Sequence, residues 1–402
     1  MKPVLSTRAK SLSSSATFAM LQKSMELKQA GIDVISMSVG EPDFATPDYI
    51  KEAAHKAIND NWTKYSPVPG YMPLREACAR KLKDENGLDY TAKQILISNG
   101  AKQSLCNAIM AVVDNGDEVV IPTPCWVSYM QMVILAGGIP VTVAAGIDQD
   151  FKVTAAQLEA AITPRTRAIM LCSPSNPTGA IYSRDELASL AEVIARHDDI
   201  VVISDEIYEH LNYIGGHESI AQFDSIRDRV VIINGVSKAY AMTGWRIGFA
   251  AGPQWLIDAA NKIQGQYTSG PCSVSQKAAE AAYCGPQDDV ETMRLAFDSR
   301  RKLLISLARE VPGFEVNEPE GAFYLFPKCS ALFGKSYKSG DDVRTINSGD
   351  DFAMFLLEKA HVATVGGDSF GAPEYFRMSY ATDEASISEA VKRIKEAVAT
   401  LE

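Results

Sequence analysis

Short apolar segments alternate with longer amphipathic segments between residues 94 and 252, and this alternation restricts the fold more than any other feature. The apolar segments have the length and the β-branched content of buried strands, whereas segments such as 102–113 and 184–197 repeat apolar residues with the period of a helix. Continuous apolar strands separated by helices are typical of a mostly parallel sheet covered on both faces. We therefore predict an α/β fold with a seven-stranded sheet. The predicted strands are residues 94–99, 118–124, 139–144, 167–173, 200–205, 229–235 and 246–252.

The pattern changes after about residue 285, which indicates a second, smaller lobe of α+β type. A long helical pattern covers residues 290–311, and short strands then alternate with helices. Residues 331–350 are polar and rich in turn-forming residues, so we expect a mobile surface loop there. The other elements predicted in this lobe are strands at 314–317, 322–327, 361–366 and 375–381 and helices at 349–360 and 384–401.

The N-terminal segment allows two interpretations. Residues 1–25 contain basic residues and many serines, with no acidic residue before Glu26, as in a transit peptide. From Phe18 onwards, however, the apolar spacing predicts an amphipathic helix that ends at Gly31, which favours a structured arm. No apolar segment approaches the length of about 18 residues that a membrane-spanning helix needs, so we expect no membrane partner.

Charge and cysteine content disfavour several classes of protein. The 402-residue chain carries a formal net charge of −11, whereas nucleic-acid-binding proteins normally carry a basic surplus. Its 7 cysteines include no Cys-x-x-Cys pair, and their number is odd. We therefore expect reduced thiols in a cytoplasmic protein, with neither a nucleic-acid partner nor a bound metal.

Polar residues follow the predicted strands, at the edge of the sheet where α/β proteins bind ligands. Taken one at a time, each has an ordinary structural explanation: Asp205 could cap a helix, Asn176 could belong to a rigid turn, and Trp126 could be a core residue. Their joint occurrence after successive strands points to one site. The set comprises Gly100, Ala101, Lys102, Trp126, Asn176, Asp205, Tyr208, Ser237 and Lys238.

The segment SKAYAMTGWRIGF, residues 237–249, contains only two charged residues. Lys238 follows an apolar strand, and a lysine held in a desolvated site has a lowered pKa and becomes a usable nucleophile. Arg246 could bind a phosphate through its planar guanidinium group, or it could pair with an acid.

These motifs resemble those of the pyridoxal-phosphate (PLP) aminotransferases of fold type I, class I. The similarity extends over nearly the whole chain and is greatest to the bacterial aspartate aminotransferase subgroup, whose N-terminal arm carries Ser-Ala-Thr, here residues 15–17. This match further favours an arm over a transit peptide. The matching segments are SVGEPDFATP (38–47), YSPVPGYMPLREA (65–77), SNGAKQ (98–103), PTPCWVSY (122–129), SPSNPTGA (173–180), SDEIYEHL (204–211), GVSKAYAMTGWRIGF (235–249), PEGAFY (319–324) and FRMSYA (376–381).

The resemblance implies a role for each catalytic candidate. Lys238 resembles the lysine that forms the Schiff base with PLP and later transfers a proton as general base and acid. Asp205 resembles the carboxylate that keeps the pyridine nitrogen protonated. Tyr208 and Asn176 resemble the pair that hydrogen-bonds the phenolic oxygen of PLP, and Trp126 resembles the residue that stacks on its ring.

The cofactor phosphate is implied to lie at the helix N-terminus that follows Gly100. Ala101, Lys102, Ser237 and Arg246 would surround it. Tyr65 resembles the residue that reaches the phosphate of the neighbouring subunit, so the resemblance implies a homodimer whose active sites are shared across the interface.

The resemblance also implies how amino-acid and 2-oxo-acid substrates bind. Arg377 resembles the arginine that holds the substrate α-carboxylate, and Gly40 would allow the backbone to approach the substrate. Lys102, with Ser15 and Thr17 from the arm, resembles the group that binds the side-chain carboxylate of a dicarboxylic substrate. Trp126 and Asn176 would also contact the substrate.

The implied reaction is transfer of the amino group between L-aspartate and 2-oxoglutarate by a ping-pong mechanism. An aminotransferase of prephenate or aromatic range is the main alternative, and a β-lyase or a non-catalytic regulator fits the residues less well. The implied organisation is an N-terminal arm joined to the smaller lobe (1–47), a large cofactor-binding domain (48–300) and a small C-terminal domain (301–402).

Overall fold

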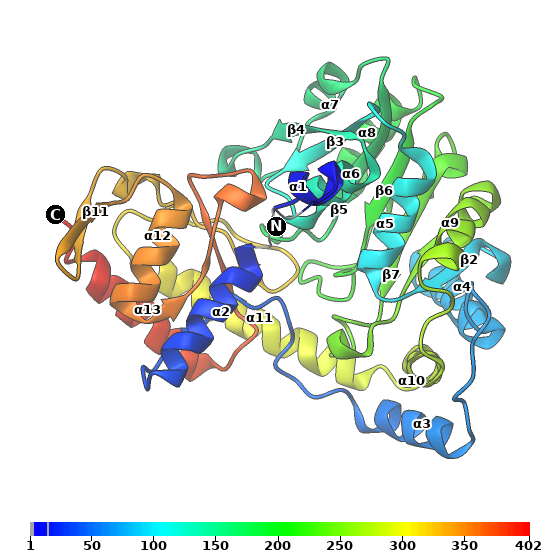
Figure 1. Ribbon diagram of the computed structural model, residues 1–402, viewed down its shortest axis with the longest axis horizontal. Coiled ribbons are helices and arrows are strands. Elements are labelled where there is room, and N and C mark those ends of the chain that lie inside the picture. The colour runs from blue at the N-terminus through cyan, green and yellow to red at the C-terminus, as the bar shows by residue number, and fades with distance from the viewer. Residues whose placement is uncertain (1–3, 14–15) are drawn as a thin grey trace.

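The computed structural model describes residues 4–13 and 16–402. Its larger lobe is built on a seven-stranded sheet with the order β2-β8-β7-β6-β5-β3-β4 (Figure 1). All seven predicted strands form, and only β8 runs antiparallel to its neighbours. Their bounds are β2 Ile95–Ser98, β3 Glu118–Thr123, β4 Ile139–Ala144, β5 Thr166–Cys172, β6 Val201–Asp205, β7 Val230–Gly235 and β8 Gly248–Ala251.

Helices cover both faces of this sheet, as the continuous apolar strands predict. Successive strand residues point to opposite faces, so Val231 and Ile233 pack on one side while Val230 and Ile232 pack on the other. One face is covered by α5 (Ala101–Val112), α6 (Ser128–Ala136) and α9 (Gln254–Tyr267). The other face is covered by α3 (Asp48–Asn59), α4 (Met72–Asn86), α7 (Ala155–Ala161), α8 (Arg184–Ile194) and α10 (Ser273–Cys284).

The smaller lobe packs around its own apolar core, to which the long helix α11 (Asp288–Ala308) contributes Phe297 and Leu304. Figure 1 shows this lobe beside the larger one, with α11 running between them. Its strands are β1 (Ile35–Ser36) paired with β12 (Val362–Ala363), and a three-stranded sheet of β9 (Tyr324–Leu325), β13 (Val365–Gly366) and β14 (Phe376–Ser379). Its helices are α12 (Gly349–Phe355), which continues as a π-helical turn (Leu356–Ala360), and α13 (Glu384–Val398).

Two predictions for the smaller lobe are wrong in part. Residues 331–350 contain a β-hairpin, β10 (Ser336–Ser339) and β11 (Asp342–Thr345), in place of an unstructured loop. Gly340, with φ at +62°, begins the two-residue turn that joins the strands, and such short polar strands carry little apolar signal. Residues 314–317 form no strand, and only Glu315 makes an isolated bridge, to Lys328.

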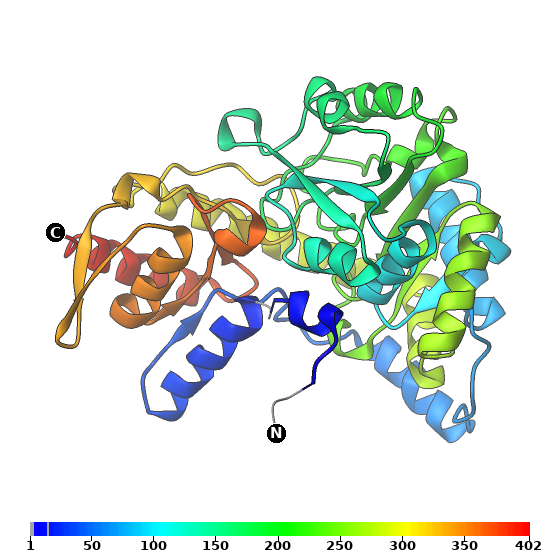
Figure 2. The ribbon, with the colours of Figure 1, turned by 45° about the horizontal axis from the view of Figure 1, so that its top comes forward.

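The N-terminal arm contains α1 (Thr7–Ser11) and α2 (Ala16–Gln29), and it links the two lobes. The predicted helix is therefore present as α2, and Gly31 follows it with φ at +85°. Figure 2 shows α2 along the smaller lobe and α1 beside the larger one, where the Ser13 N–H donates to Gln131 Oε1 of α6 at 2.9 Å. In the part of the chain described here, no helix combines the length and apolarity needed to cross a membrane.

Candidate active site

A cavity of about 520 Å³ opens at the carboxyl edge of the large sheet and extends to side chains of the smaller lobe. Parallel strands bring their carboxyl ends to one edge, which explains why residues distant in sequence meet here. Arg246 precedes β8, but because β8 runs antiparallel, Arg246 lies at the same edge. The predicted site residues that line the cavity are Gly40, Ala101, Lys102, Trp126, Asn176, Asp205, Tyr208, Ser237, Lys238, Arg246 and Arg377.

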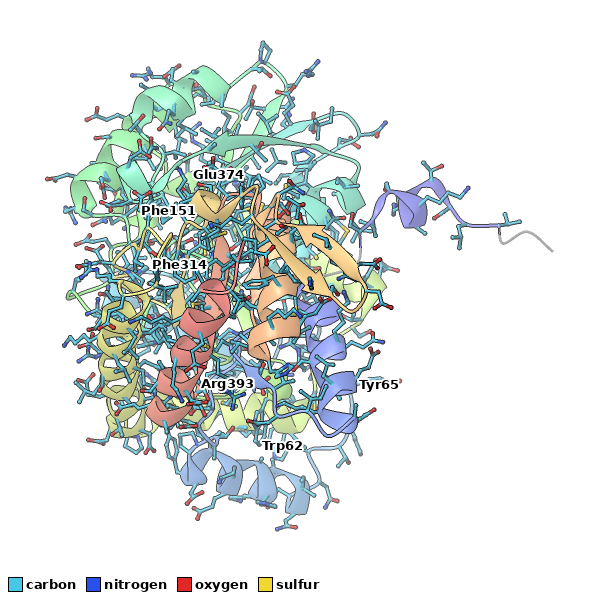
Figure 3. The ribbon with its side chains drawn as sticks, turned by 90° about the vertical axis from the view of Figure 1, so that its left-hand side faces the viewer. Trp62, Tyr65, Phe151, Phe314, Glu374 and Arg393 are labelled. Atoms are coloured by element: carbon cyan, nitrogen blue, oxygen red, sulfur yellow. The ribbon has the colours of Figure 1, made fainter. Side chains whose placement is uncertain are left out.

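Two of the described predicted residues, Gly100 and Tyr65, do not line the cavity. Gly100 lies directly beside it, as the residue before α5. Tyr65 is 98% exposed and lies at the outer edge of the molecule in Figure 3. Ser15 is outside the described residues, and for Thr17, near the start of α2, only the backbone is described.

Lys238 follows the carboxyl end of β7, and its ammonium group donates to the carbonyl oxygen of Gly40 at 2.6 Å. Burial lowers the pKa of Lys238 to about 8, and the positive charges of Arg377 and Arg246 act in the same direction. A substantial fraction of this amine is therefore neutral near physiological pH, as a nucleophile requires.

Asp205 ends β6 and is 4% exposed. The hydroxyl of Tyr129 donates to its Oδ2 at 2.6 Å, and the backbone N–H of Ile207 donates to its Oδ1 at 3.3 Å. Burial raises the pKa of Asp205 to about 6, although both hydrogen bonds oppose this rise. A cationic group placed against this carboxylate would keep it ionised.

Tyr208 and Asn176 each pair with a residue of the smaller lobe. The Tyr208 and Tyr324 hydroxyls lie 2.8 Å apart, and Asn176 Oδ1 accepts a hydrogen bond from Arg377 Nη1 at 2.8 Å. These contacts join the lobes directly across the cavity.

The Arg377 guanidinium group is almost fully buried, at 2% exposure. Its Nη2 donates to the carbonyl oxygen of Ser38 at 2.7 Å, and the group lies 4.4 Å from the centre of the Tyr324 ring. Its Nε is buried and has no partner among the described residues. A carboxylate entering the cavity could accept from this N–H.

The N-terminus of α5 provides a site for an anion. Gly100 has φ at +77°, and a Cβ atom there would overlap the Arg246 guanidinium group, so only glycine allows this approach. Arg246 donates to the carbonyl oxygens of Thr243 at 2.9 Å and Asn99 at 3.3 Å. The free N–H groups of the first turn of α5 and this guanidinium group together suit a phosphate.

Gly40 illustrates a second close approach. A Cβ atom at this position would lie 2.6 Å from the Tyr324 hydroxyl, so a side chain would displace Tyr324 or close the cavity. Lys102 lies across the cavity, with its Nζ 4.7 Å from the centre of the Trp126 ring.

Sequence reasoning missed Tyr129 and Tyr324 as members of the site. Tyr129 lies in the first turn of α6, three residues after Trp126, and the two rings meet edge to face with centroids 5.5 Å apart. Both tyrosines fall inside segments that carry the family resemblance, PTPCWVSY and PEGAFY, which is the signal that could have identified them.

Comparison with known proteins gives the family. The chain matches the family Aminotransferase class I and II over residues 32–394. The chain belongs to the class I and II aminotransferases. It is 48% identical over 400 residues to the probable aspartate/prephenate aminotransferase of Rickettsia bellii, covering 99% of this chain and 100% of the relative. It is 50% identical over 383 residues to the aspartate/prephenate aminotransferase of Cereibacter sphaeroides, covering 95% of each chain. The crystal structure of the aspartate aminotransferase from Rhizobium meliloti has a TM-score of 0.95 at 44% identity, covering 99% of this chain and 100% of that one.

Class I and II aminotransferases are PLP-dependent enzymes, and the residues of this cavity fit that cofactor. PLP, when bound, supplies an aldehyde that reacts with amines and a ring that accepts electrons. Lys238 would supply the amine for the aldehyde, Asp205 a buried carboxylate for the ring nitrogen, and the N-terminus of α5 an anion site for the phosphate. Tyr208 and Asn176 would supply hydrogen-bonding groups for the phenolic oxygen.

Replacing Tyr129 with Phe tests how Asp205 is kept ionised. The variant loses a hydrogen bond to a charged carboxylate, so we expect the pKa of Asp205 to rise from about 6 by roughly one further unit. Pairing with a protonated ring nitrogen requires the ionised carboxylate. As the pH is lowered, the variant should therefore lose affinity for PLP at a higher pH than the wild-type protein does. Titration of the cofactor-free protein with PLP between about pH 5 and 8 measures the shift of this acid limb.

The control is Tyr90→Phe, which removes a buried hydroxyl that has no partner among the described residues and does not line the cavity. This control should keep the wild-type profile. If PLP affinity has the same pH midpoint in Tyr129→Phe and in the wild-type protein, Tyr129 does not help to keep Asp205 ionised.

Proposed function

We propose that this aminotransferase transfers the amino group between L-aspartate and 2-oxoglutarate, yielding oxaloacetate and L-glutamate by a ping-pong mechanism. The observation that carries the proposal is a cavity with two cationic groups besides Lys238 and Arg246. Arg377 and Lys102 both line it, and neither has a carboxylate within ion-pair distance among the described residues. A dicarboxylic substrate supplies two carboxylates for these two groups.

The roles of the chain's own residues follow from the contacts. Arg377, fixed by Asn176 and Ser38, binds the substrate α-carboxylate, and Lys102 binds the side-chain carboxylate. Lys238 then moves a proton at the substrate Cα, because its pKa of about 8 allows it both to accept and to return a proton near neutral pH.

We propose further that the enzyme works as a homodimer in the cytoplasm. Tyr65 projects into solvent at 98% exposure, which suits a residue that reaches the phosphate site of a second copy. All seven cysteines are free thiols, which suits a reducing compartment.

A panel of amino donors and 2-oxo acceptors tests the proposal with the purified PLP-loaded enzyme. L-Aspartate alone should discharge the visible absorption band of the bound cofactor, and 2-oxoglutarate should restore it. A band that stays unchanged in saturating L-aspartate would refute the proposed donor.

Prephenate is the second candidate acceptor, because the relatives from Rickettsia bellii and Cereibacter sphaeroides carry the name aspartate/prephenate aminotransferase. The same panel separates the candidates. If 2-oxoglutarate is the only acceptor that supports turnover of L-aspartate, the enzyme is an aspartate aminotransferase of narrow acceptor range. If prephenate also supports turnover, the enzyme accepts both.

Replacing Lys102 with Met tests recognition of the side-chain carboxylate. The loss of a charge-assisted hydrogen bond, about 1.5–3 kcal/mol, should lower kcat/KM for L-aspartate about 10- to 100-fold. Activity on a monocarboxylic donor such as L-alanine should change little, because that substrate does not use Lys102. Lys56→Met, at a side chain that is 74% exposed, is the matched control. An equal loss for both donors would contradict the role of Lys102.

A further inference from the structure

A buried cluster of charged residues lies behind the segment that carries Asp205 and Tyr208. Glu206 and Glu209 alternate with these two residues but do not line the cavity, and both are buried, at 1% and 5% exposure. The proposed function assigns no role to either glutamate.

Glu209 is held mainly by α4. It forms an ion pair with Lys81, and both side chains are almost fully buried, at 3% and 2% exposure. Asn86 donates to Glu209 Oε2 at 2.9 Å and accepts from the Lys81 ammonium group at 2.7 Å. Burial acts to raise the pKa of Glu209, but Lys81, with smaller contributions from His210 and His217, outweighs it, so the pKa lies well below the ordinary value.

Glu206 is held by residues that follow it in the chain and by one that precedes it. Its Oε1 accepts from Ser204 at 2.8 Å and from Ser219 at 2.7 Å. The His217 ring nitrogen Nε2 lies 2.9 Å from Glu206 Oε2. Both glutamates are therefore fixed on the side of the segment that faces away from the cavity.

The backbone holds the start of this segment more firmly than its end. The Glu206 N–H donates to the Ile233 carbonyl of β7 at 2.8 Å, next to the end of β6. Residues 207–210 then form turns and no regular helix, with backbone hydrogen bonds from the Glu209 N–H to the Glu206 carbonyl and from the Leu211 N–H to the Tyr208 carbonyl. A rearrangement of this turn would therefore move Tyr208, whose hydroxyl lies 2.8 Å from that of Tyr324, while Asp205 stays paired in β6.

Buried ion pairs seldom stabilise a fold more than apolar residues of the same volume, and their best-attested use is to select one arrangement over others. We infer that the Lys81–Glu209 ion pair is a positioning device, which fixes the turn after β6 so that Tyr208 faces the cofactor. The inference rests on the proposed cofactor contact of Tyr208. Lys81 and Glu209 act only through that residue.

The test uses the PLP-loaded enzyme and the pH titration of its visible absorption band, together with the dissociation constant of PLP. Lys81→Met removes the main positive charge beside Glu209 and leaves Asn86, with His210 Nδ1 at 3.6 Å, so the turn should shift and Tyr208 should lose its hydrogen bond to the phenolic oxygen. We expect the midpoint of the titration to rise by about one pH unit and the dissociation constant to rise about tenfold. The double variant Lys81→Met/Glu209→Gln leaves neither an unpaired charge nor an ion pair, so it should keep most of both losses. Full recovery in the double variant would overturn the inference, because the losses of Lys81→Met would then come from the unpaired charge alone.

Lys83→Met is the matched control on the same helix, because the Lys83 side chain is 65% exposed and pairs only with Asp89 at 3.3 Å. It should keep the wild-type midpoint. If Lys81→Met fails to fold, Glu209→Gln replaces it, since Lys81 keeps Asn86 and lies 3.4 Å from Glu85, and the same upward shift is expected.

A variant with a lower melting temperature but wild-type midpoint and PLP affinity would overturn the inference, because the pair would then stabilise the fold only. L-Aspartate turnover of the wild-type enzyme is measured in parallel. A failure of the proposed substrate would appear there, while the titration alone judges the positioning role.

Discussion

The burial of the Lys238 amine beside positively charged groups is the interaction on which the rest of the site depends. The lysine follows β7 into a cavity that burial and the charges of Arg377 and Arg246 make unfavourable for an ammonium ion. A lysine at the surface would be almost entirely protonated near neutral pH and would therefore react poorly with an aldehyde. The large sheet positions this amine at its carboxyl edge, and Gly40 and the smaller lobe enclose it.

Charge is distributed over the cavity by the fold. The carboxyl edge of the sheet brings Asp205 to one end, and the N-terminus of α5 with Arg246 forms an anion site. The smaller lobe contributes Arg377, whose contacts with Asn176 and Ser38 depend on the relative position of the two lobes. A change in that position would also alter the surroundings of Tyr208 and Lys238, which contact Tyr324 and Gly40.

The sequence predicts the large sheet well because its strands are continuous apolar segments, a signal that survives without tertiary information. It predicts the smaller lobe less well. The strands of the hairpin β10–β11 are short and polar, so the sequence resembles a loop. Residues around Glu315 resemble a strand in sequence, but only Glu315 forms a bridge.

The site residues could be predicted from the sequence because they follow strands and match family motifs. The residues that they contact could not be predicted in this way. Nothing in the spacing shows that Tyr129 donates to Asp205, or that Lys81 neutralises Glu209 from a helix more than a hundred residues away. Such pairs depend on packing between elements, which the period of a single segment does not encode. The roles of the site residues, including those of Tyr65, Ser15 and Thr17, are predictions.

Chemical fixation of the cofactor tests the central claim most directly. Borohydride reduction of the PLP-loaded enzyme, followed by proteolysis and mass spectrometry, identifies the lysine that holds the cofactor. The account predicts that the pyridoxyl group is found on the peptide that contains Lys238. Its recovery on Lys102 or on any other lysine would contradict the account.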